Sequence, residues 1–389
     1  MVRWSHAGVH VAVRPGSVSV ARSSHWVHTF DGAGRWVQGA GAGRWWRRGL
    51  DGTVWEGMGG ERRGVRLTGD EAAKVAEAAR SAAAHALQCW PPALPRPEED
   101  ERALRCAVAM DRTRAAADAA AFAALYTGPV PIVPGDLTRA VYLQPTVGCR
   151  WNRCTYCSLY ADRAHAVRGP VEFAGHVAAV VRWFGAGLGM RRSVFLGDAD
   201  ILVAGAAPVQ GWLAELGRAA VLPAATTRAF AAARSVLACA GRDLATLRLA
   251  GLGRLYLGLE TAAPSVRRRL QRPDSIAQLG DAVRHAQAAG IEIALTVIAG
   301  VGGRAAAAEH VAQTAEWIVR SGLRPGSLIS VSPLLDETAA VAQPVAPGHL
   351  RQSAPCDPGE LAHQAAALRD RLAPAGLRVA PYDIAAFVR

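Results

Sequence analysis

The chain has no long hydrophobic run. No stretch of its 389 residues approaches the roughly 18 to 20 uninterrupted apolar residues that a membrane-spanning helix needs. The segment that follows Met1 also lacks the apolar core of a secretory signal peptide. We therefore expect a soluble cytoplasmic protein with no membrane partner.

The chain is also almost without lysine. Lys74 is the only lysine among its 44 basic residues, yet the formal net charge is +12 because arginine is abundant. Such an excess ordinarily indicates nucleic acid or another polyanion as a partner. The arginines are dispersed, however, and the sequence shows no basic stripe interleaved with aromatic residues. A solvated surface is the favoured interpretation, and nucleic acid is a less favoured partner.

Cysteines are few, and their number, seven, is odd. This argues against a framework of disulfides. Cys149, Cys154 and Cys157 lie close together with the spacing C-x4-C-x2-C. Thiolates so close repel each other or oxidise unless a metal holds them. Three ligands on one loop leave one coordination position open, which in a [4Fe–4S] cluster would leave one iron free for a substrate or cosubstrate.

The spacing of the cysteines alone also allows other kinds of metal centre. Plant-type ferredoxins share this spacing but add a fourth cysteine, and the next cysteine here, Cys239, is far along the chain. A zinc site with His165 as fourth ligand is another alternative. Either would make the chain a non-enzymatic metal-binding or electron-transfer module.

Residues 1–67 alternate short β-type runs with glycine-rich turns, which predicts a small antiparallel sheet. Seven of the chain's 11 tryptophans lie within the first 90 residues, so we expect them to fill a small aromatic core. The segment Trp45–Gly52 is the exception to consider, because it could instead face a substrate or RNA.

Residues 68–134 form a helical segment and a linker in this interpretation. Thr68 and Glu71 have the spacing of a capping box, followed by a helix to about Leu87. Prolines interrupt residues 91–97, and one helix is expected over residues 98–125. Residues 126–134 contain three further prolines and predict an extended linker, which we take as a domain boundary.

Residues 135–335 alternate strand and helix patterns in six units. This predicts a parallel sheet covered by helices, and most simply a partial (β/α)6 TIM-like barrel. Residues 336–389 are expected to be a C-terminal extension. The expected strands are Arg139–Leu143, Ser193–Leu196, a weaker one near Ala219–Leu222, Leu255–Leu259, Ile291–Ile298 and Ser327–Ser332. The expected helices are Val171–Phe184, Pro208–Leu216, Arg242–Ala250, Ile276–Ala289 and Ala305–Ser321.

Polar residues and glycines follow several of these strands. Asp198 and Asp200 follow the second strand, Glu260 ends the fourth, and glycines follow the fifth. Chemistry in such barrels gathers at the carboxyl ends of the strands, where the cysteine loop also lies. Each residue alone could simply cap a helix or form a turn.

Several ordered motifs together resemble the radical S-adenosylmethionine (SAM) enzymes, specifically a branch with the C-x4-C-x2-C motif. The resemblance covers roughly residues 126–389. The expected fold class is therefore α/β, a partial barrel preceded by a small N-terminal β-rich and helical domain. Its motifs are Gly148–Tyr160, Val194–Leu202, Leu257–Thr261, Leu270–Pro273, Ile298–Gly303 with His310 and Thr314, and Val379–Phe387. Phe30–Arg35 and Arg47–Gly52 also resemble the N-terminal part of some members.

The resemblance implies roles for particular residues. Three irons of a [4Fe–4S] cluster would be ligated by the three clustered cysteines, and SAM would chelate the fourth. Tyr156 would lie against the adenine, and Glu260 would hold the amino group or ribose. The other implied SAM-binding residues are Gly197, Asp198 and Asp200 after the second strand, and Ile298 and Gly300 after the fifth. The family often has Gly-Gly-Glu where this chain has Gly197-Asp198, a departure from its pattern.

The expected activity is reductive cleavage of SAM to a 5′-deoxyadenosyl radical, which takes hydrogen from a small-molecule or natural-product substrate. An external electron donor of the flavodoxin or ferredoxin type would be needed. An enzyme that modifies RNA is the alternative. No second cluster is expected, because the other cysteines stand apart. Cys356 is expected to be a structural thiol, with a role as a covalent or hydrogen-atom donor near the radical as the less favoured alternative.

Overall fold

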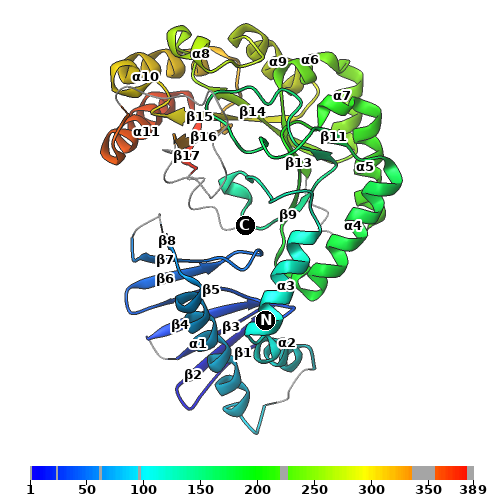
Figure 1. Ribbon diagram of the computed structural model, residues 1–389, viewed down its shortest axis with the longest axis vertical. Helices are drawn as coiled ribbons and strands as arrows, with labels where there is room; N and C mark the ends of the chain where they lie inside the picture. Colours follow the sequence, from blue (N-terminus) through cyan, green and yellow to red (C-terminus); the bar gives the residue numbers. More distant parts are fainter. Residues whose placement is uncertain are drawn as a thin grey trace. The chain divides into compact units, whose positions relative to one another are not determined.

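A computed structural model describes residues 2–22, 25–60, 64–94, 98–219, 227–334 and 355–382. The chain divides into two compact units, labelled by their elements in Figure 1. The first unit runs through Val130 and includes Ala178–Arg192. The second contains Pro131–Val177 and the described residues from Ser193 to Tyr382. None of the described helices is long and apolar enough to cross a bilayer.

The first unit contains an eight-stranded antiparallel meander in which each strand pairs with the next. The N-terminal sheet prediction is therefore confirmed. Two hairpins turn at Ala7-Gly8 and Ala42-Gly43, where both residues have positive φ, as tight hairpin turns require. The strands are β1 (Val2–His6), β2 (Val9–Arg14), β3 (Ser17–Arg22), β4 (Trp26–Asp31), β5 (Trp36–Gly41), β6 (Arg44–Arg48), β7 (Val54–Met58) and β8 (Val65–Arg66).

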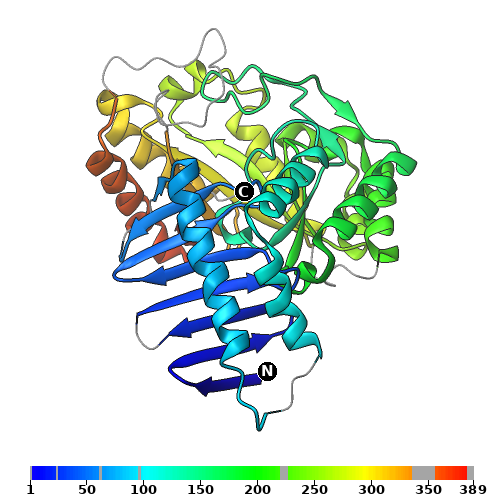
Figure 2. The same cartoon turned by 60° about the horizontal axis from the view of Figure 1, so that its bottom comes forward.

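Two helices cover one face of this sheet. Helix α1 (Gly69–Gln88) runs across the strands in Figure 2, and α2 (Glu98–Ala109) packs beside it. The core consists of valines and aromatic side chains of the sheet against small alanines of α1, including Ala79 and Ala83. Trp46 packs against this core, as expected, whereas its neighbour Trp45 lies on the other face by strand alternation.

The expected single helix over residues 98–125 is wrong. The structure has two helices, α2 and α3 (Arg112–Ala124), because Asp111 caps the second one by accepting a hydrogen bond from the Arg114 backbone N–H at 2.8 Å. The alanine-rich sequence around this cap contains neither glycine nor proline to indicate the break. The Thr68 capping box of α1 is confirmed.

A buried arginine ties the first unit together. Arg35, in the turn between β4 and β5, donates to both carboxylate oxygens of Asp118 on α3 at 2.8 and 2.9 Å. It also donates to the carbonyl oxygens of Trp183 and Phe184. These two residues end α4 (Pro170–Phe184), whose residues from Ala178 onward belong to this unit. The Phe30–Arg35 motif therefore has a structural function here.

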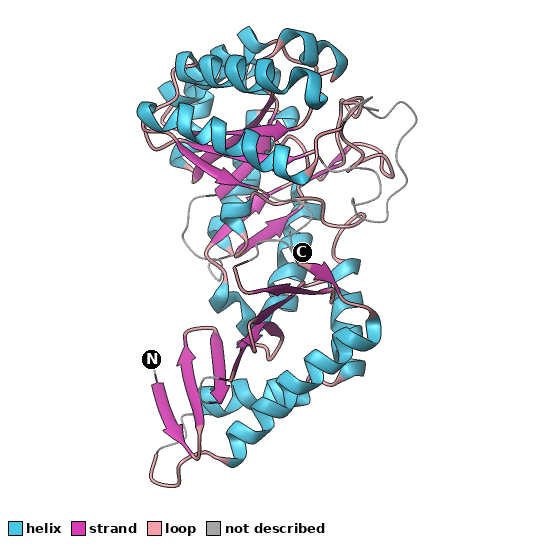
Figure 3. Cartoon of the chain, turned by 90° about the vertical axis from the view of Figure 1, so that its left-hand side faces the viewer, coloured by secondary structure: helices cyan, strands magenta, loops and turns pink. Residues whose placement is uncertain are grey.

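The second unit contains a seven-stranded sheet in the order β17-β16-β15-β14-β13-β12-β9, with all neighbours parallel. In Figure 3 the helices, drawn in cyan, cover the outer side of these strands, drawn in magenta. This confirms the predicted α/β partial barrel. Its strands are β9 (Ala140–Leu143), β12 (Ser193–Leu196), β13 (Thr227–Ala231), β14 (Leu252–Glu260), β15 (Glu292–Ala299), β16 (Leu328–Pro333) and β17 (Arg378–Pro381).

Helices and short helical turns connect these strands. They are η1 (Gly135–Leu137), η2 (Gly185–Met190, in the first unit), η3 (Leu202–Ala204), α5 (Ala206–Arg218), α6 (Ala233–Ala238), α7 (Gly241–Leu249), α8 (Pro264–Arg269), α9 (Ile276–Ala288), α10 (Gly303–Arg320), α11 (Pro358–Leu372) and η4 (Ala373–Ala375).

Two strand expectations need correction. The third strand is β13, later than the expected Ala219–Leu222, where Ala219 instead caps α5 and residues 220–222 lie outside the described residues. The expected six strands also missed β17, which pairs with β16 inside the expected C-terminal extension. Both strands are short and interrupted by polar residues or proline, so their apolar pattern is weak.

Candidate functional site

The cysteine loop follows the first barrel strand, at the carboxyl end of the sheet. A two-stranded ribbon, β10 (Thr146–Val147) with β11 (Ala166–Val167), brackets the loop. Gly148 precedes Cys149 with a φ of 68°, and a Cβ there would press on the Ala164 carbonyl oxygen at 3.1 Å. Glycine is therefore favoured at this position. All three cysteines are half-buried.

The loop is held against the end of α8. The Thr155 backbone N–H donates to the Leu270 carbonyl at 3.2 Å, and its hydroxyl donates to the Arg269 carbonyl at 2.8 Å. The Trp151 indole N–H donates to the Gln271 carbonyl, also at 2.8 Å. Two of the resembling motifs, Gly148–Tyr160 and Leu270–Pro273, are therefore in contact through backbone acceptors.

A buried network joins Tyr156 to Glu260. The Tyr156 hydroxyl donates to Glu260 Oε1 at 3.0 Å and accepts from Arg272 Nη1 at 2.8 Å. Arg272 also donates to the Gly258 carbonyl at 2.6 Å and lies 3.4 Å from Glu260 Oε1. Burial raises the pKa of Tyr156 well above its usual value. For Arg272, burial alone would lower the pKa, but the charges of Tyr156 and Glu260 raise it.

The backbone at the end of β14 aims Glu260 into this network. The ladder with β15 shifts register between Gly258 and Glu260, and Glu260 has a φ of 60°. A Cβ at Gly258 would collide with the Glu260 carboxylate. Thr296 on β15 donates to Glu260 Oε2 at 3.3 Å. Glu260 is 6% exposed, so its carboxylate is available only to groups within the site.

Ile298 and Gly300 lie close to the same region. Ile298 and Tyr156 pack against one apolar cluster that includes Val266 and Leu270. Gly300, with a φ of 84°, donates its N–H to Gln364 Oε1 of α11 at 2.8 Å. A Cβ at Gly300 would collide with the side chain of Leu361. The structure therefore brings Tyr156, Glu260, Ile298 and Gly300 to one end of the barrel.

Asp198, which we expected to bind SAM, is buried and holds the cysteine loop. It is 1% exposed and accepts hydrogen bonds from the Tyr142 hydroxyl, from Gln144 Nε2 at 3.2 Å and from the Gly148 N–H at 2.6 Å. Burial raises the pKa of Asp198, and these hydrogen bonds oppose that shift. Its carboxylate therefore holds the residue that precedes Cys149. A Cβ at Gly197 would collide with Tyr142, which accounts for the glycine.

Asp200 caps neighbouring elements. Its Oδ1 accepts from the Leu202 N–H at 3.0 Å, and its Oδ2 accepts from the Ser235 hydroxyl at 2.6 Å. Burial raises the pKa of Asp200 to about 6, although the Ser235 bond opposes this. These contacts link η3 to α6, so the structure supports the capping alternative for this residue.

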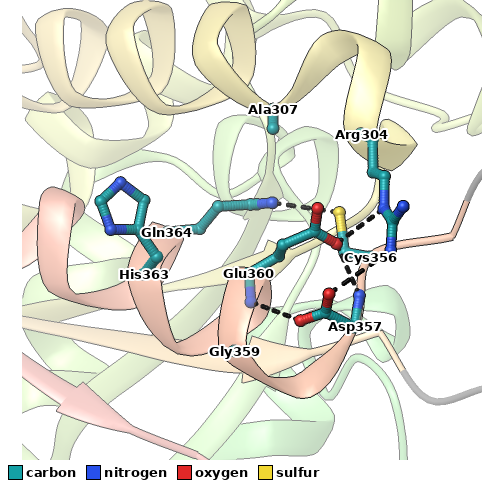
Figure 4. Close-up of a pocket in the computed structure, with 8 residues that line it drawn as sticks. All are labelled: Arg304, Ala307, Cys356, Asp357, Gly359, Glu360, His363 and Gln364. Carbon is teal, nitrogen blue, oxygen red and sulfur yellow. Dashed lines mark hydrogen bonds and ion pairs between the residues drawn. The ribbon is translucent and has the colours of Figure 1, made fainter.

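A cavity of about 400 Å³ lies between the starts of α10 and α11. Figure 4 labels the residues that line it. Cys356 lines it, and its sulfur accepts from Gln364 Nε2 at 3.3 Å. Arg304 pairs there with Glu360 at 2.9 Å and with Asp357 at 3.4 Å.

His310 is buried on α10, where its Nδ1 is 2.8 Å from the Thr261 hydroxyl oxygen. Of the Val379–Phe387 motif, only residues up to Tyr382 are among those described.

The three cysteines provide a set of three thiol donors on one loop. Burial raises the pKa of Cys157 to about 12, and the charges of the nearby Cys154 and Cys149 raise it further. Within the described ranges, no three His, Cys, Asp or Glu side chains are grouped closely enough for one metal ion. An iron–sulfur cube spaces its thiolate ligands more widely than one ion does. The donor set of three thiols therefore fits a [4Fe–4S] centre.

Sequence reasoning missed the role of Arg272. It lies in the Leu270–Pro273 motif, but nothing in the spacing indicated that its guanidinium reaches both Tyr156 and Glu260. It also missed Tyr142 and Gln144, which hold Asp198. Apart from the Arg272–Glu260 pair, these contacts join residues more than 50 positions apart, so no local pattern reports them.

Residues 143–318 match the family model described as the Radical SAM superfamily. This part of the chain is therefore a radical SAM domain, and the predicted superfamily is confirmed. Members of this superfamily use a [4Fe–4S] cluster and SAM as cofactors. The cysteine loop, Asp198 and Glu260 all lie within the matched residues.

Several solved structures are similar at low sequence identity. Coproporphyrinogen III oxidase (HemN) from Escherichia coli, a radical SAM enzyme, is 15% identical with a TM-score of 0.46, covering 61% of this chain and 52% of its own. Methylornithine synthase (PylB) is 17% identical with a TM-score of 0.41, covering 63% and 72%.

The cobalamin-dependent radical SAM enzyme OxsB is 16% identical with a TM-score of 0.37. That match covers 46% of this chain and only 26% of OxsB, so the chain spans well under two thirds of it. No curated protein matches the sequence.

The capping function of Asp200 predicts a change in pH dependence. The native state keeps its proton up to about pH 6, whereas the unfolded chain loses it near pH 3.8, so wild-type stability falls as the pH rises between these values. The Asp200→Asn variant has no carboxyl group at this position and so does not lose this stability. The free energy of unfolding of the variant minus that of wild type should rise by up to about 3 kcal/mol between about pH 4 and pH 7.

Urea unfolding of both proteins across this pH range measures the difference. The variant should also bind SAM as wild type does. A difference in stability that does not change with pH would contradict the raised pKa of Asp200. A loss of SAM affinity would show that Asp200 belongs to the cosubstrate site.

Proposed function

We propose that Cys149, Cys154 and Cys157 ligate the cluster and that the enzyme removes a hydrogen atom from a small polar molecule. When bound, the cluster and SAM supply an electron and a 5′-deoxyadenosyl radical. The chain's own residues hold these groups, orient the cosubstrate and exclude water. The electron comes from an external donor of the flavodoxin or ferredoxin type.

The single observation that carries this proposal is the buried Tyr156–Glu260–Arg272 network beside the thiols. Arg272 Nε is buried and has no hydrogen-bond partner among the described residues. A buried N–H donor of this kind needs an acceptor, because leaving it unsatisfied costs free energy. The carboxylate of SAM is such an acceptor, and Glu260 Oε1 or Oε2 can accept from its amino group or ribose.

The remaining predicted residues have supporting functions in this proposal. Ile298 supplies an apolar surface for the adenine, with Tyr156 on the same apolar cluster, and Gly300 beside it makes room for Leu361 of α11. Asp198 and Gly197 act on the loop through Gly148. Asp198 is in this view a positioning residue, since its carboxylate is buried and already accepts three groups.

A row of hydroxyl groups favours a polar substrate. Thr296 on β15 is the cross-strand partner of Ser330 on β16, and Ile298 is the partner of Ser332. Strand alternation places Ser330 and Ser332 on the same face as Thr296, whose hydroxyl contacts Glu260. Both serines are buried, at 3% and 4% exposure, so they would serve a molecule held inside the barrel. Hydroxyl groups there can pair with hydroxyl, amino or carbonyl groups.

RNA modification is the second candidate function. One specific observation favours it, the cationic and aromatic side chains on one face of the first unit's sheet. The substrate would then be a nucleotide that enters the same barrel end.

The cluster assignment predicts the behaviour of Cys154→Ala. Wild-type protein reconstituted anaerobically with iron and sulfide, then reduced with SAM present, should form 5′-deoxyadenosine. Cys154→Ala should form none and should lose the cluster absorbance, because one of three ligands is missing. The barrel should stay folded, since the loop lies outside the main apolar layers.

Cys106→Ala is the matched control, because it removes a half-buried thiol from α2 in the first unit. It should keep both the absorbance and the product. A full cluster in Cys154→Ala would show that the ligands are assigned wrongly. A full wild-type cluster whose spectrum does not change on addition of SAM would contradict the proposed cofactor chemistry.

The network predicts that Arg272→Gln and Glu260→Gln weaken SAM binding while most of the iron is retained. Each removes one charge-assisted hydrogen-bonding group, so the Kd should rise about tenfold or more. Arg268 is a nearby exposed arginine, so Arg268→Gln is the control and should bind SAM as wild type does. Equilibrium binding of SAM with parallel iron analysis makes the comparison. Unchanged affinity in both buried variants would remove this network from the cosubstrate site.

A further inference from the structure

One face of the first unit's sheet lies opposite α1 and α2, and η2 packs near β3 and β4, where Asp31 is buried. The sheet's strand registers align eight residues in one row across all eight strands, from β1 to β8. The Ser19 and Thr29 hydroxyls of this row are 3.0 Å apart, which confirms that they share a face. We call this surface the open face. Its row consists of Arg3, Ala12, Ser19, Thr29, Gln38, Arg47, Trp55 and Arg66.

The described strands of the open face carry cations and no exposed acid. Arg3, Arg47 and Arg66 are all exposed, and none has an ion pair among the described residues. The only carboxylate on the strands of this face is Asp31, which is fully buried and pairs with Arg35. The row therefore presents positive charge at both ends and near the β6 strand. By the usual strand spacing it spans roughly 34 Å.

Aromatic side chains lie among these cations. Trp45 is on β6, two residues before Arg47, and its cross-strand partner on β7 is Gly57. A Cβ at Gly57 would collide with the Trp45 ring, so the ring lies against the sheet at that point. The Arg47 guanidinium lies 4.9 Å from the centre of this ring. Trp55, the partner of Arg47 on β7, is half-buried like Trp45.

We propose that the open face binds single-stranded nucleic acid. Stacking platforms for single strands combine aromatic rings with cations that follow the phosphates, and Trp45, Trp55 and Arg47 have this combination. Ser19, Thr29 and Gln38 add neutral hydrogen-bonding groups along the track. RNA and DNA share the phosphate and base chemistry, so the test includes both.

The test is fluorescence anisotropy of the full reconstituted protein with labelled single-stranded oligonucleotides. Oligouridine and oligothymidine of about 16 residues, the upper end of single-site lengths, serve as the RNA and DNA probes. Wild type should bind at physiological salt, and its affinity should fall steeply as salt rises. Arg47→Gln should weaken binding and reduce the salt slope by about one. Trp45→Ala should weaken it by roughly tenfold, with less effect on the slope.

Arg44→Gln is the matched control. Arg44 is exposed on the same strand but belongs to the opposite face by alternation, where it pairs with Glu56 at 2.9 Å. It should bind as wild type does. Thermal unfolding of each variant shows whether it still folds. If Trp45→Ala does not fold, Arg47→Gln still tests the proposal, because the Arg47 side chain is exposed.

Three results would overturn the proposal. They are no binding by wild type at physiological salt, equal losses in Arg44→Gln and Arg47→Gln, or displacement of the oligonucleotide by polyglutamate at equal charge. The last would identify an acidic peptide as the occupant. Tighter binding of oligouridine than oligothymidine would identify RNA, and the reverse would identify DNA. Formation of 5′-deoxyadenosine is measured separately, so either proposal can fail while the other stands.

Discussion

The site depends on one buried carboxylate. Glu260 ends the central strand of the barrel in a backbone conformation that sets it toward the cysteine loop, and Tyr156 of that loop donates to it at 3.0 Å. Arg272 supplies the positive charge that allows this carboxylate to be buried. The loop that carries the three cysteines is therefore bonded to the barrel. Their position is fixed to the strand that carries the proposed cosubstrate contact.

A second buried carboxylate fixes the other end of the same loop. Asp198 holds the Gly148 N–H directly before the first cysteine, and Tyr142 and Gln144 hold Asp198. The loop is thus bonded at Gly148, Thr155 and Tyr156 to three different parts of the barrel. Such multiple attachment pre-organises the ligands, so cluster binding would need little reordering of the chain.

Local sequence reasoning identified the parts of the site that depend on spacing. The three cysteines, the β14 strand ending at Glu260 and the glycines after β15 follow from patterns within a few residues. It could not distinguish between a contact with cosubstrate and a buried structural bond for Asp198 and Asp200. That distinction depends on Tyr142 and Ser235, which are distant in sequence. Arg272 was missed for the same reason.

The fold shows the same division. Strongly apolar strands such as β12 and β15 and the capping box at Thr68 were predicted within one or two residues. β13 and β17 were not, because each owes its place to pairing with a neighbour rather than to its own apolar content. Trp45 and Trp46 are adjacent, yet only the sheet register separates a core side chain from one on the open face.

The most direct measurement of the central claim is electron paramagnetic resonance of the reduced cluster with SAM labelled with nitrogen-15 at its amino group. If three cysteines leave one iron for SAM, the cluster signal should change on binding and show magnetic coupling to the labelled nitrogen. A reduced cluster whose signal shows no coupling and stays unchanged with saturating SAM would contradict that claim.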